Sequence, residues 1–555
     1  MDEIQNEWVW WKHGVIYHIY PLSFNDTNND GKGDLRGIIE KLNYFETLGI
    51  DAIWLSPIFQ SPMADCGYDI SDYYSIDPVF GNLNEFKELL QKAHARNIMV
   101  ILDMVLNHTS VNHPWFIASR SDKMNPKRNW FIWEPASGKR KPNNWKTAFG
   151  GSCWEYDKTT SEYYLHSFFK EQPDLNWRNK EVRNEMFKML SYWLEMGVDG
   201  FRFDVINYIV KDKKLRNNPF LYGIFSLRKI KTRNRPKSYK IIRSLRKLMD
   251  KYPDKMSVGE IYTLPPGDPK LTASYLLKGN NSLQLTFDFS IFFVRWNARK
   301  YFRTIEKWQN SIPEKGWPSN VFSNHDLFRA FNRRGIGRNQ EQKARLMALL
   351  LLTIKGTAFI YYGEEIGMKN GNIPKSRIQD PLGKKFWPFF KGRDRARTPM
   401  QWENSSFAGF SVTEPWLPVN NDYQNVNVEN QLSDPDSLLN LYRQLIHLRR
   451  SYPALHSGSW IPVCKGKNGI LAYFRKSEFV QFLIVLNFTS KKKQYFYNFK
   501  PFFKLIFSTF PFPAKSYMED FIWLQPFEGV IIQLHEEGEL KNSNIHHSIC
   551  YFPYY

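Results

Sequence analysis

The sequence predicts an α/β fold: a (β/α)8 TIM barrel with a lobe inserted after the third strand and a C-terminal antiparallel β-domain. Three observations support this prediction. Eight short strand-like runs recur along the chain, most of them are followed by a helical pattern, and polar residues stand at the C-terminal ends of several runs. Alternating buried strands and helices are typical of parallel sheets, and eight such units are the number that closes a barrel.

The predicted strands are short, and several are almost wholly apolar, as strands covered on both faces are. Helical periodicity lies between them, as in Asn84–Arg96 and Lys180–Met196. The strands are expected at Gly14–Phe24, Ile50–Pro57, Ile98–Asn107, Val198–Ile206, Met256–Tyr262, Leu285–Phe289, Asn320–Asn324 and Thr357–Gly363.

Two stretches depart from this alternation in a chain of 555 residues. Residues 108–176 are dense in Trp, Asn, Lys and Gly and lack barrel periodicity, which predicts a lobe over the barrel mouth. After the helical run Leu438–Arg450, short β-like segments predict a separate C-terminal module. The expected boundaries are 1–107 and 177–455 for the barrel, 108–176 for the lobe, 456–538 for the β-domain and 539–555 for a tail.

Composition excludes a disordered or low-complexity chain, since 42% of the residues are hydrophobic and 24% are charged. The formal net charge of +21 raises the possibility of nucleic-acid or anionic-membrane binding. A lysine-rich solvated surface is the favoured interpretation, because the cations are spread along the chain and no nucleic-acid module is recognisable. We therefore expect no nucleic-acid and no membrane partner.

The location expected from the sequence is cytoplasmic. The four cysteines are widely separated, with no pair at metal-ligand spacing, which suits a reducing compartment. The opening residues Met-Asp-Glu-Ile show no basic and apolar leader. The longest apolar run, Leu346–Ile354, is far shorter than the ~20 residues of a membrane span.

Polar residues close four of the predicted strands, a position that in a barrel faces the active-site mouth. Any one of them could be a helix cap or a hydrogen-bonded core group, but four together at one mouth favour a functional site. These strand ends are Asp103–His108, Gly200–Asn207, Gly259–Glu260 and Asn324–Asp326.

With these motifs in this order, the sequence resembles the α-amylase family of glycoside hydrolases, from about Trp10 to the C-terminal β-domain. It is similar in particular to the exo-acting α-glucosidase and oligo-1,6-glucosidase branch. The words that carry this closer resemblance are Tyr17-His-Ile-Tyr-Pro21, Gln172-Pro-Asp-Leu-Asn-Trp177, Gly363-Glu-Glu-Ile-Gly-Met368 and Ala396-Arg-Thr-Pro-Met-Gln-Trp402.

The resemblance implies Asp204 as nucleophile, Glu260 as general acid/base and Asp326 as transition-state stabiliser. Glycosidic cleavage needs one carboxylate for the anomeric carbon and one carboxylic acid for the leaving oxygen. Asp204 and Glu260 end adjacent predicted strands, which can bring their carboxyl groups to the ~5–5.5 Å of a retaining pair. Arg202, two residues before Asp204, points to the same face and can hold that carboxylate ionised.

The resemblance also implies a pocket for the terminal glucose. Asp65 is expected to accept hydrogen bonds from the non-reducing-end hydroxyls, and Tyr68 to stack on the sugar ring. Arg397 is expected to pair with a pocket carboxylate or a sugar hydroxyl. His108 and His325 are expected to donate hydrogen bonds to sugar hydroxyls. A pocket of this kind implies exo-action, with one glucose released at a time.

A cluster of oxygen-bearing side chains between positions 26 and 34 resembles a calcium loop, because the oxygens alternate with turn glycines. The resemblance implies a structural Ca2+ or Mg2+ with no part in catalysis. A polar turn without metal is the alternative. The implied ligands are Asp26, Asn28, Asp30, the Lys32 carbonyl and Asp34.

The predicted function is that of an exo-acting retaining α-glucosidase that releases glucose from short α-glucosides. Val205 follows the nucleophile, and related enzymes with valine there tend to prefer α-1,6 bonds, so α-1,6 linkages are expected to be slightly favoured over α-1,4. The lysine-rich stretch Lys211–Lys251 resembles maltase-like relatives equally well. The oligomeric state stays open.

Three alternatives compete with this prediction. The first is a phospho-disaccharide hydrolase of the trehalose-6-phosphate type, although no basic cluster adjoins a pocket motif. The second is a sucrose isomerase or transglucosylase, which would share every catalytic residue. The third is a non-enzymatic homologue among transporter heavy chains, which the intact carboxylates and the lack of an anchor disfavour.

Overall fold

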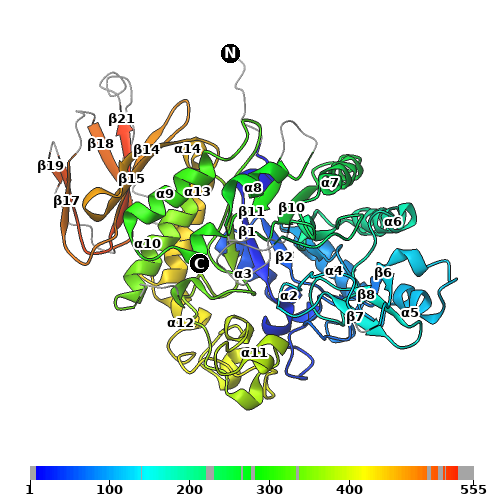
Figure 1. Cartoon of the computed structure of the whole chain (residues 1–555). Helices are drawn as coiled ribbons and strands as arrows, with labels where there is room; N and C mark the ends of the chain where they lie inside the picture. Colours follow the sequence, from blue (N-terminus) through cyan, green and yellow to red (C-terminus); the bar gives the residue numbers. More distant parts are fainter. Residues whose placement is uncertain are drawn as a thin grey trace.

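The structure is a computed structural model, and the placement of most of the chain is described (Figure 1). The tail expected at 539–555 lies outside the described residues, as do residues 536–538 of the expected β-domain. The described residues are 8–138, 140–219, 230–263, 267–276, 282–332, 337–496, 502–510, 517–518 and 521–535.

Eight parallel strands form the central sheet, in the order β11-β10-β9-β5-β2-β1-β13-β12. The two end strands meet where the Ser319 hydroxyl donates to the Thr286 carbonyl at 2.8 Å, which brings the barrel round on itself. The predicted TIM barrel is confirmed, and each strand falls on a predicted run. The strands are β1 Val15–Ile19, β2 Ala52–Leu55, β5 Met99–Met104, β9 Gly200–Phe203, β10 Met256–Glu260, β11 Leu285–Phe287, β12 Ser319–Val321 and β13 Thr357–Tyr361.

Helices cover the barrel, and local sequence fixes where they begin and end. Asn82 caps the first turn of α4 in a capping box with Glu85, and Gly197 ends α6 in the left-handed region at φ 113°. The helices around the barrel are α1 Trp10–His13, α2 Leu35–Glu40, α3 Leu42–Leu48, α4 Leu83–His94, α6 Lys180–Met196, α7 Pro236–Met249, α8 Pro269–Ala273, α9 Ala298–Gln309, α10 Gln340–Thr353, α11 Pro381–Phe386, α12 Val428–Ser433, α13 Leu438–Ser451 and α14 Pro453–His456.

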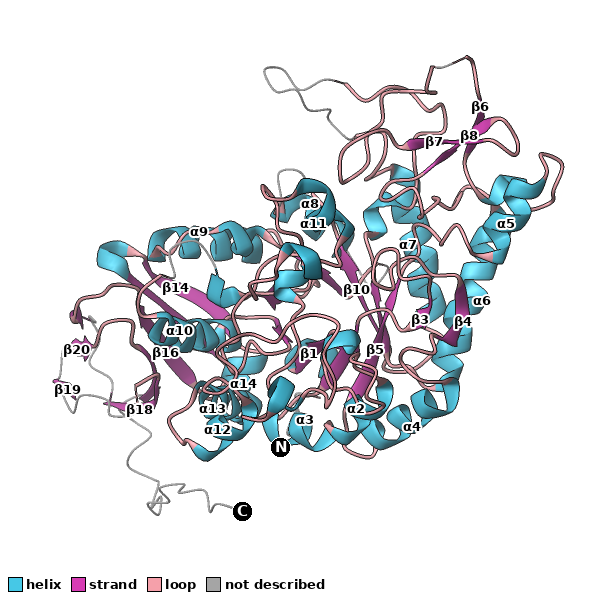
Figure 2. Cartoon of the chain, turned by 90° about the horizontal axis from the view of Figure 1, so that it is seen from below, coloured by secondary structure: helices cyan, strands magenta, loops and turns pink. Residues whose placement is uncertain are grey.

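Residues 108–176, between β5 and α6, carry helix α5 (Pro114–Ser121) and a small antiparallel sheet. This sheet has its own apolar cluster, which includes Trp145, Trp154 and Leu165. The segment lies on the opposite side of the barrel from the C-terminal sheet in both views (Figures 1 and 2). Its strands are β6 Trp133–Pro135, β7 Trp154–Asp157 and β8 Glu162–Leu165, and a hairpin of β3 Phe59–Gln60 and β4 Asp72–Ile76 stands after β2.

The C-terminal module is antiparallel, as predicted, with a five-stranded sheet β14-β15-β16-β21-β18 and a three-stranded sheet β17-β20-β19. Helix α10 packs between it and the barrel, and the Thr353 hydroxyl lies 2.7 Å from the Tyr473 hydroxyl. This position explains the apolar run Leu346–Ile354, which is buried all round. The strands are β14 Ser459–Lys465, β15 Ile470–Lys476, β16 Gln481–Asn487, β17 Lys493–Phe496, β18 Phe502–Ser508, β19 Tyr517–Met518, β20 Phe521–Leu524 and β21 Gly529–His535.

None of the helices in the described ranges is long and apolar enough to cross a membrane. Cys66, Cys153 and Cys464 form no disulfide within the described ranges, and Cys550 lies outside them.

Candidate active site

The register of the barrel strands places the two predicted catalytic carboxylates side by side. Phe203 of β9 pairs with Gly259 of β10, so the next residues, Asp204 and Glu260, leave the barrel together at its C-terminal mouth. Both side chains are buried among the surrounding protein and line one cavity of about 290 Å3. The sequence-based expectation that these carboxylates adjoin therefore matches their placement.

Arg202 connects three carboxylates at this mouth. Its Nη1 donates to Asp103 Oδ1 at 2.7 Å and to Asp204 Oδ1 at 2.8 Å, and its Nη2 donates to Glu260 Oε2 at 2.5 Å. Arg202 is itself 2% exposed, so these contacts are made away from bulk water. Charge-assisted hydrogen bonds of this kind fix side-chain positions as well as charge.

Burial and neighbouring charges shift the pKa values of Asp204 and Asp103 in this cluster. Burial raises the pKa of Asp204 well above its usual range, Arg202 opposes the shift, and the neighbouring Glu260 and Asp103 charges add to it. Burial likewise raises the pKa of Asp103 to about 6, against the attraction of Arg202. Carboxylates packed this closely cannot all ionise freely, so Asp204 holds its proton more readily than an isolated carboxylic acid does.

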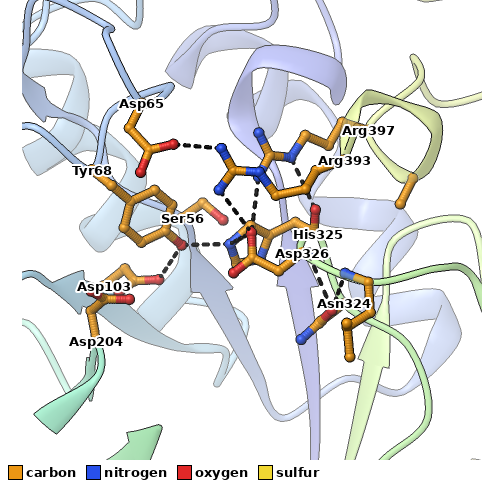
Figure 3. Close-up of polar contacts among 12 residues, drawn as sticks. Ser56, Asp65, Tyr68, Asp103, Asp204, Asn324, His325, Asp326, Arg393 and Arg397 are labelled. Atoms are coloured by element: carbon orange, nitrogen blue, oxygen red, sulfur yellow. Dashed lines mark hydrogen bonds and ion pairs between the residues drawn. The ribbon is translucent and has the colours of Figure 1, made fainter. Parts of the chain in front are cut away.

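Asp326 lies across the cavity and is held by two arginines (Figure 3). Arg397 Nη2 lies 2.9 Å and Arg393 Nη1 lies 3.4 Å from Asp326 Oδ1. Burial opposes ionisation of Asp326, but nearby His325 and these two guanidinium groups outweigh it and hold the pKa of Asp326 below its usual range. Asp326 is therefore a fixed negative charge, while its side chain remains 34% exposed.

Asp65, Arg393 and Gln172 form one hydrogen-bonded group on the cavity wall. Arg393 Nη2 donates to Asp65 Oδ1 at 2.6 Å and to Asp380 Oδ1 at 2.8 Å, and Gln172 Nε2 donates to Asp65 Oδ2 at 3.1 Å. All four side chains are buried, and three of them, Asp65, Arg393 and Gln172, line the cavity.

Tyr68 stands beside Asp65 on the cavity wall, with His325 behind it. The Tyr68 hydroxyl donates to Asp103 Oδ2 at 3.0 Å and lies 2.8 Å from His325 Nε2, and the two rings stack at 5.4 Å. Because the single hydroxyl proton goes to Asp103, His325 Nε2–H donates to the tyrosine oxygen. His325 therefore supports Tyr68 from behind. The sequence predicts that His325 donates hydrogen bonds to sugar hydroxyls, whereas the structure does not place it among the residues that line the cavity.

The other two predicted pocket residues, His108 and Arg397, also differ in whether they line the cavity. His108 lines the cavity, and its Nε2 lies 3.0 Å from the Tyr68 carbonyl, while burial lowers its pKa to about 4. Arg397 is fully buried behind Asp326 and also donates from Nε to the His325 carbonyl at 2.9 Å. Of the two contacts expected for Arg397, the structure makes the one with a pocket carboxylate.

Val205 lies on the cavity wall and has an unusual backbone. Its φ of 34° and ψ of 43° place a β-branched residue in the left-handed region, where such side chains are strained. This conformation points its N–H toward Glu260 Oε2, at 3.3 Å. The residue that follows Asp204 after β9 thus contacts Glu260 at the end of the neighbouring strand β10.

Three functional candidates were not assigned a role by sequence reasoning: Asp103, Gln172 and Arg393. Asp103 and Gln172 belong to motifs that carry the family resemblance. The sequence therefore draws attention to both residues but assigns no function to either. Arg393 stands four residues before Arg397, just outside the motif Ala396–Trp402 that carries the family resemblance. Only the fold shows that this arginine, and not Arg397, reaches both Asp65 and the cavity.

The proposed metal loop is organised by its own backbone. Asp26 accepts backbone N–H groups of the loop at 2.8 Å through both oxygens, Asp30 accepts from Lys32 N at 2.8 Å, and Asn28 accepts from Asp30 N at 3.0 Å. Asp34 caps α2. Within the described ranges, no three His, Cys, Asp or Glu side chains are grouped to hold a metal ion. The donor set consists of hard oxygens only, which fits Ca2+ or Mg2+ in chemistry.

Comparison with known proteins agrees with this geometry. The chain is 41% identical over 517 residues to an oligo-1,6-glucosidase of Parageobacillus thermoglucosidasius, covering 87% of this chain and 91% of that protein. It is 36% identical over 510 residues to a trehalose-6-phosphate hydrolase of Bacillus subtilis, covering 86% and 90%. The crystal structure of the α-glucosyl transfer enzyme XgtA superposes with a TM-score of 0.89 at 36% identity, covering 95% of this chain and 100% of that one.

Residues 18–458, which include the whole barrel apart from the start of β1, match the family described as alpha amylase, catalytic domain. The strand-end motifs expected of that family meet in one cavity, with the two adjacent carboxylates bridged by Arg202. The chain therefore belongs to the α-amylase family of glycoside hydrolases.

Proposed function

We propose that the protein is an exo-acting, retaining α-glucosidase that releases glucose from the non-reducing end of short α-glucosides. The buried polar group around Asp65 carries this proposal. There Asp65, bound by Arg393 and Gln172, faces the same cavity as Asp204 and Glu260. A buried polar wall next to the reacting carboxylates suits the hydroxyl groups of one terminal sugar.

The retaining outcome is supported by the shared guanidinium. Since Arg202 hydrogen-bonds both Asp204 and Glu260, the two carboxyl groups lie close together, as in the ~5–5.5 Å pairs of retaining enzymes and unlike the ~6.5–9.5 Å pairs of inverting ones.

In the first step, Asp204 attacks the anomeric carbon as Glu260 protonates the leaving oxygen. Arg202 holds Asp204 through Oδ1, and no other contact among the described residues engages Oδ2, which leaves that oxygen for attack. Glu260 is held through Oε2 by Arg202 and by Val205 N–H, so its Oε1 is the oxygen that can carry the proton.

In the second step, Glu260, now a carboxylate, removes a proton from water, and the water oxygen attacks the anomeric carbon and frees Asp204. Asp326 keeps its negative charge throughout and stabilises the positive charge that develops on the sugar ring in both transition states. Glucose leaves with the α-configuration it had in the substrate.

We propose a slight preference for α-1,6 over α-1,4 linkages, supported by Val205 on the cavity wall. The trehalose-6-phosphate type of substrate has less support. Among the described residues of the cavity wall, Arg393 is the one side chain with a permanent positive charge, and Asp65 and Asp380 already engage it. A phosphate on the second sugar would need a further cation.

We also propose that loop 26–34 binds a structural Ca2+ or Mg2+ through Asp26, Asn28, Asp30, Asp34 and the Lys32 carbonyl. The cation would tie the loop that leads into α2 and would supply no chemistry to the glycosidase steps. We further propose a cytoplasmic location and a small sugar as the sole partner, with neither nucleic acid nor membrane involved.

Product analysis on maltose, isomaltose, panose, sucrose, trehalose and trehalose 6-phosphate tests the activity, with proton NMR recording the anomer first released. We expect α-glucose from isomaltose, panose and maltose. Activity confined to trehalose 6-phosphate, isomerised sucrose as the main product, or release of β-glucose would each overturn the corresponding part of the proposal.

A further inference from the structure

A second cavity lies beside helix α6, and its described lining residues include none of those that line the catalytic cavity. Its volume is about 420 Å3. Three parts of the chain form its wall: the β3–β4 hairpin, the first residues of α5 in the inserted segment, and α6 (Figure 2). None of the proposed catalytic steps uses this cavity.

Tyr73 of β4 separates the two cavities. Its side chain is 1% exposed and belongs to the wall of the second cavity. Its hydroxyl lies 2.8 Å from the Val105 carbonyl and 2.9 Å from the carbonyl of His108, which lines the catalytic cavity. The second cavity is therefore a separate site and not an extension of the first.

His113 supplies a buried donor to the second cavity. It is 4% exposed and lines the wall, and its Nδ1 accepts the backbone N–H of Trp115 at 3.1 Å. Burial lowers the pKa of His113 to about 3, so the ring is neutral and its one proton is on Nε2. No hydrogen bond within the described ranges engages Nε2–H. Because an unpaired buried donor costs free energy, this group favours a ligand that brings an acceptor atom.

Two carboxylates supply acceptors to the same cavity. Asp72 of β4 accepts the Tyr74 backbone N–H at 2.8 Å and the Ser75 hydroxyl at 2.7 Å, one at each oxygen. Glu185 of α6 accepts the Tyr74 hydroxyl through Oε1 at 3.0 Å, and its Oε2 has no hydrogen-bond partner in the part of the chain that the structure describes. Since each carboxylate oxygen has two lone pairs, both side chains can accept further hydrogen bonds from a ligand.

Aromatic and amide side chains complete the wall. Trp115 is half-buried, and its ring stacks on Tyr73 with centroids 6.0 Å apart. The amides of Gln60 and Asn112 add donors and acceptors at exposed positions of the wall. An aromatic face with a few polar groups around it is typical of a small-molecule site.

We propose that this cavity is a second saccharide site, which binds a neutral sugar without cleaving it. A sugar hydroxyl both accepts and donates, so one ligand can accept from His113 Nε2–H and donate to Asp72 and Glu185. An anion would instead face two carboxylates, and an ammonium group has no acceptor for His113. The proposal does not depend on the glucosidase mechanism.

Equilibrium dialysis with radiolabelled D-glucose tests the site, because glucose has no glycosidic bond to cleave. We expect two glucose molecules per chain at saturation in the wild type, one in each cavity. Glu185→Ala should bind one fewer, because removing a charged hydrogen-bond acceptor weakens binding about tenfold or more. Its kcat/KM for isomaltose should stay that of the wild type, since Glu185 does not line the catalytic cavity.

Glu181→Ala is the matched control. Glu181 stands one turn earlier on α6, and it accepts the Trp130 indole N–H at 2.8 Å much as Glu185 accepts the Tyr74 hydroxyl. It does not line the second cavity, so this variant should bind as many glucose molecules as the wild type.

His113→Asn is a second variant. Asparagine can keep the cap of α5 but removes Nε2–H, and it should weaken glucose binding at this site about three- to tenfold. D-glucuronate and spermidine serve as the anionic and cationic probes, and neither should bind in a manner that Glu185→Ala abolishes.

Equal numbers of bound glucose molecules in the wild type and Glu185→Ala would overturn the second site. Spermidine binding that Glu185→Ala abolishes, with glucose binding unchanged, would assign a cation site in its place. A wild type that cleaves none of the disaccharides, yet binds one more glucose than Glu185→Ala, would refute the proposed function and uphold this site.

Discussion

Lys211 and Asp174 form an ion pair in the interior, with Nζ 2.7 Å from Oδ2 and both side chains at most 2% exposed. Lys211 follows β9, and Asp174 lies at the end of the inserted segment. Asn107, three residues after β5, completes the group: its Oδ1 accepts from Lys211 Nζ at 2.7 Å and its Nδ2 donates to Asp174 Oδ1 at 2.9 Å. The group therefore ties the inserted segment to the barrel mouth, beside the cavity residue His108.

Lys211→Met should lower the free energy of unfolding by about 3–5 kcal/mol, because it leaves the Asp174 carboxylate buried without its partner. Urea unfolding measures the loss. Lys213→Met is the control, since Lys213 is exposed two residues away and should change stability by less than ~0.5 kcal/mol. Similar values for the two variants would show that the ion pair does not hold the segment in place.

Arg393→Lys should lower kcat/KM for isomaltose by about 10–150-fold, the range for hydrogen bonds to charged groups. A lysine cannot reach Asp65 and Asp380 together as the guanidinium does. Arg395→Lys is the matched control, because Arg395 donates to the Gly371 carbonyl and is not among the cavity-lining residues. An Arg393→Lys enzyme with unchanged kcat/KM would remove this arginine from sugar recognition.

Asp204→Asn should abolish turnover without unfolding the protein, since an amide cannot form the glucosyl ester. Glu260→Gln should lose most activity on disaccharides and retain more on aryl glucosides, whose leaving groups need less protonation. Steady-state kinetics on both substrate types and a thermal melt of each variant measure these effects. Equal losses on both substrate types would refute the acid/base role of Glu260.

Chelation should lower the melting temperature without blocking catalysis directly. A cation that binds only the folded state stabilises it by ~2.7 kcal/mol at a hundredfold excess over Kd. Asp30→Ala should remove the response to chelator. Asp122→Ala should keep it, since Asp122 is likewise exposed and accepts a backbone N–H in its own turn, but lies outside the loop. An unchanged melt after chelation, with no metal found by elemental analysis, would show that the loop is a polar turn.

Periodicity was sufficient to predict the barrel because its strands and helices are local features. The predicted helix Lys180–Met196 coincides with α6, whose ends are fixed by Asn179 and Gly197. The run Gly14–Phe24 was predicted too long: β1 ends at Ile19, and Pro21 begins a short 3-10 helix because it cannot donate to the strand ladder.

The site was predictable only where its residues end strands. The pairing of β9 with β10 places Asp204 and Glu260 together at the barrel mouth. Eight alternating strand–helix units in a sequence imply this parallel arrangement. Arg393 and Asp65 meet from loops 328 residues apart, and no local pattern encodes that contact.

The proposed linkage preference rests on Val205, whose side chain lies on the cavity wall directly after the proposed nucleophile Asp204. A β-branched apolar group there narrows the acceptor side and disfavours the compact α-1,4 acceptor, whereas the extra exocyclic carbon of an α-1,6 bond can pass around it. One or two methyl groups in a pocket are worth ~1–3 kcal/mol, or ~10–200-fold in discrimination. We therefore expect isomaltose and panose to be cut better than maltose.

Val205→Thr separates polarity from shape. Threonine keeps the β-branching, so it meets the same strain at φ 34°, and it keeps the backbone N–H that points to Glu260. The substitution replaces one methyl group with a hydroxyl group that can hydrogen-bond an α-1,4 acceptor, so kcat/KM for maltose should rise relative to isomaltose. Val205→Ala tests the steric effect alone and should move the ratio in the same direction. If the wild type already prefers maltose, or if neither variant moves the ratio, Val205 does not set the linkage, and the glucosidase activity itself is unaffected by that outcome.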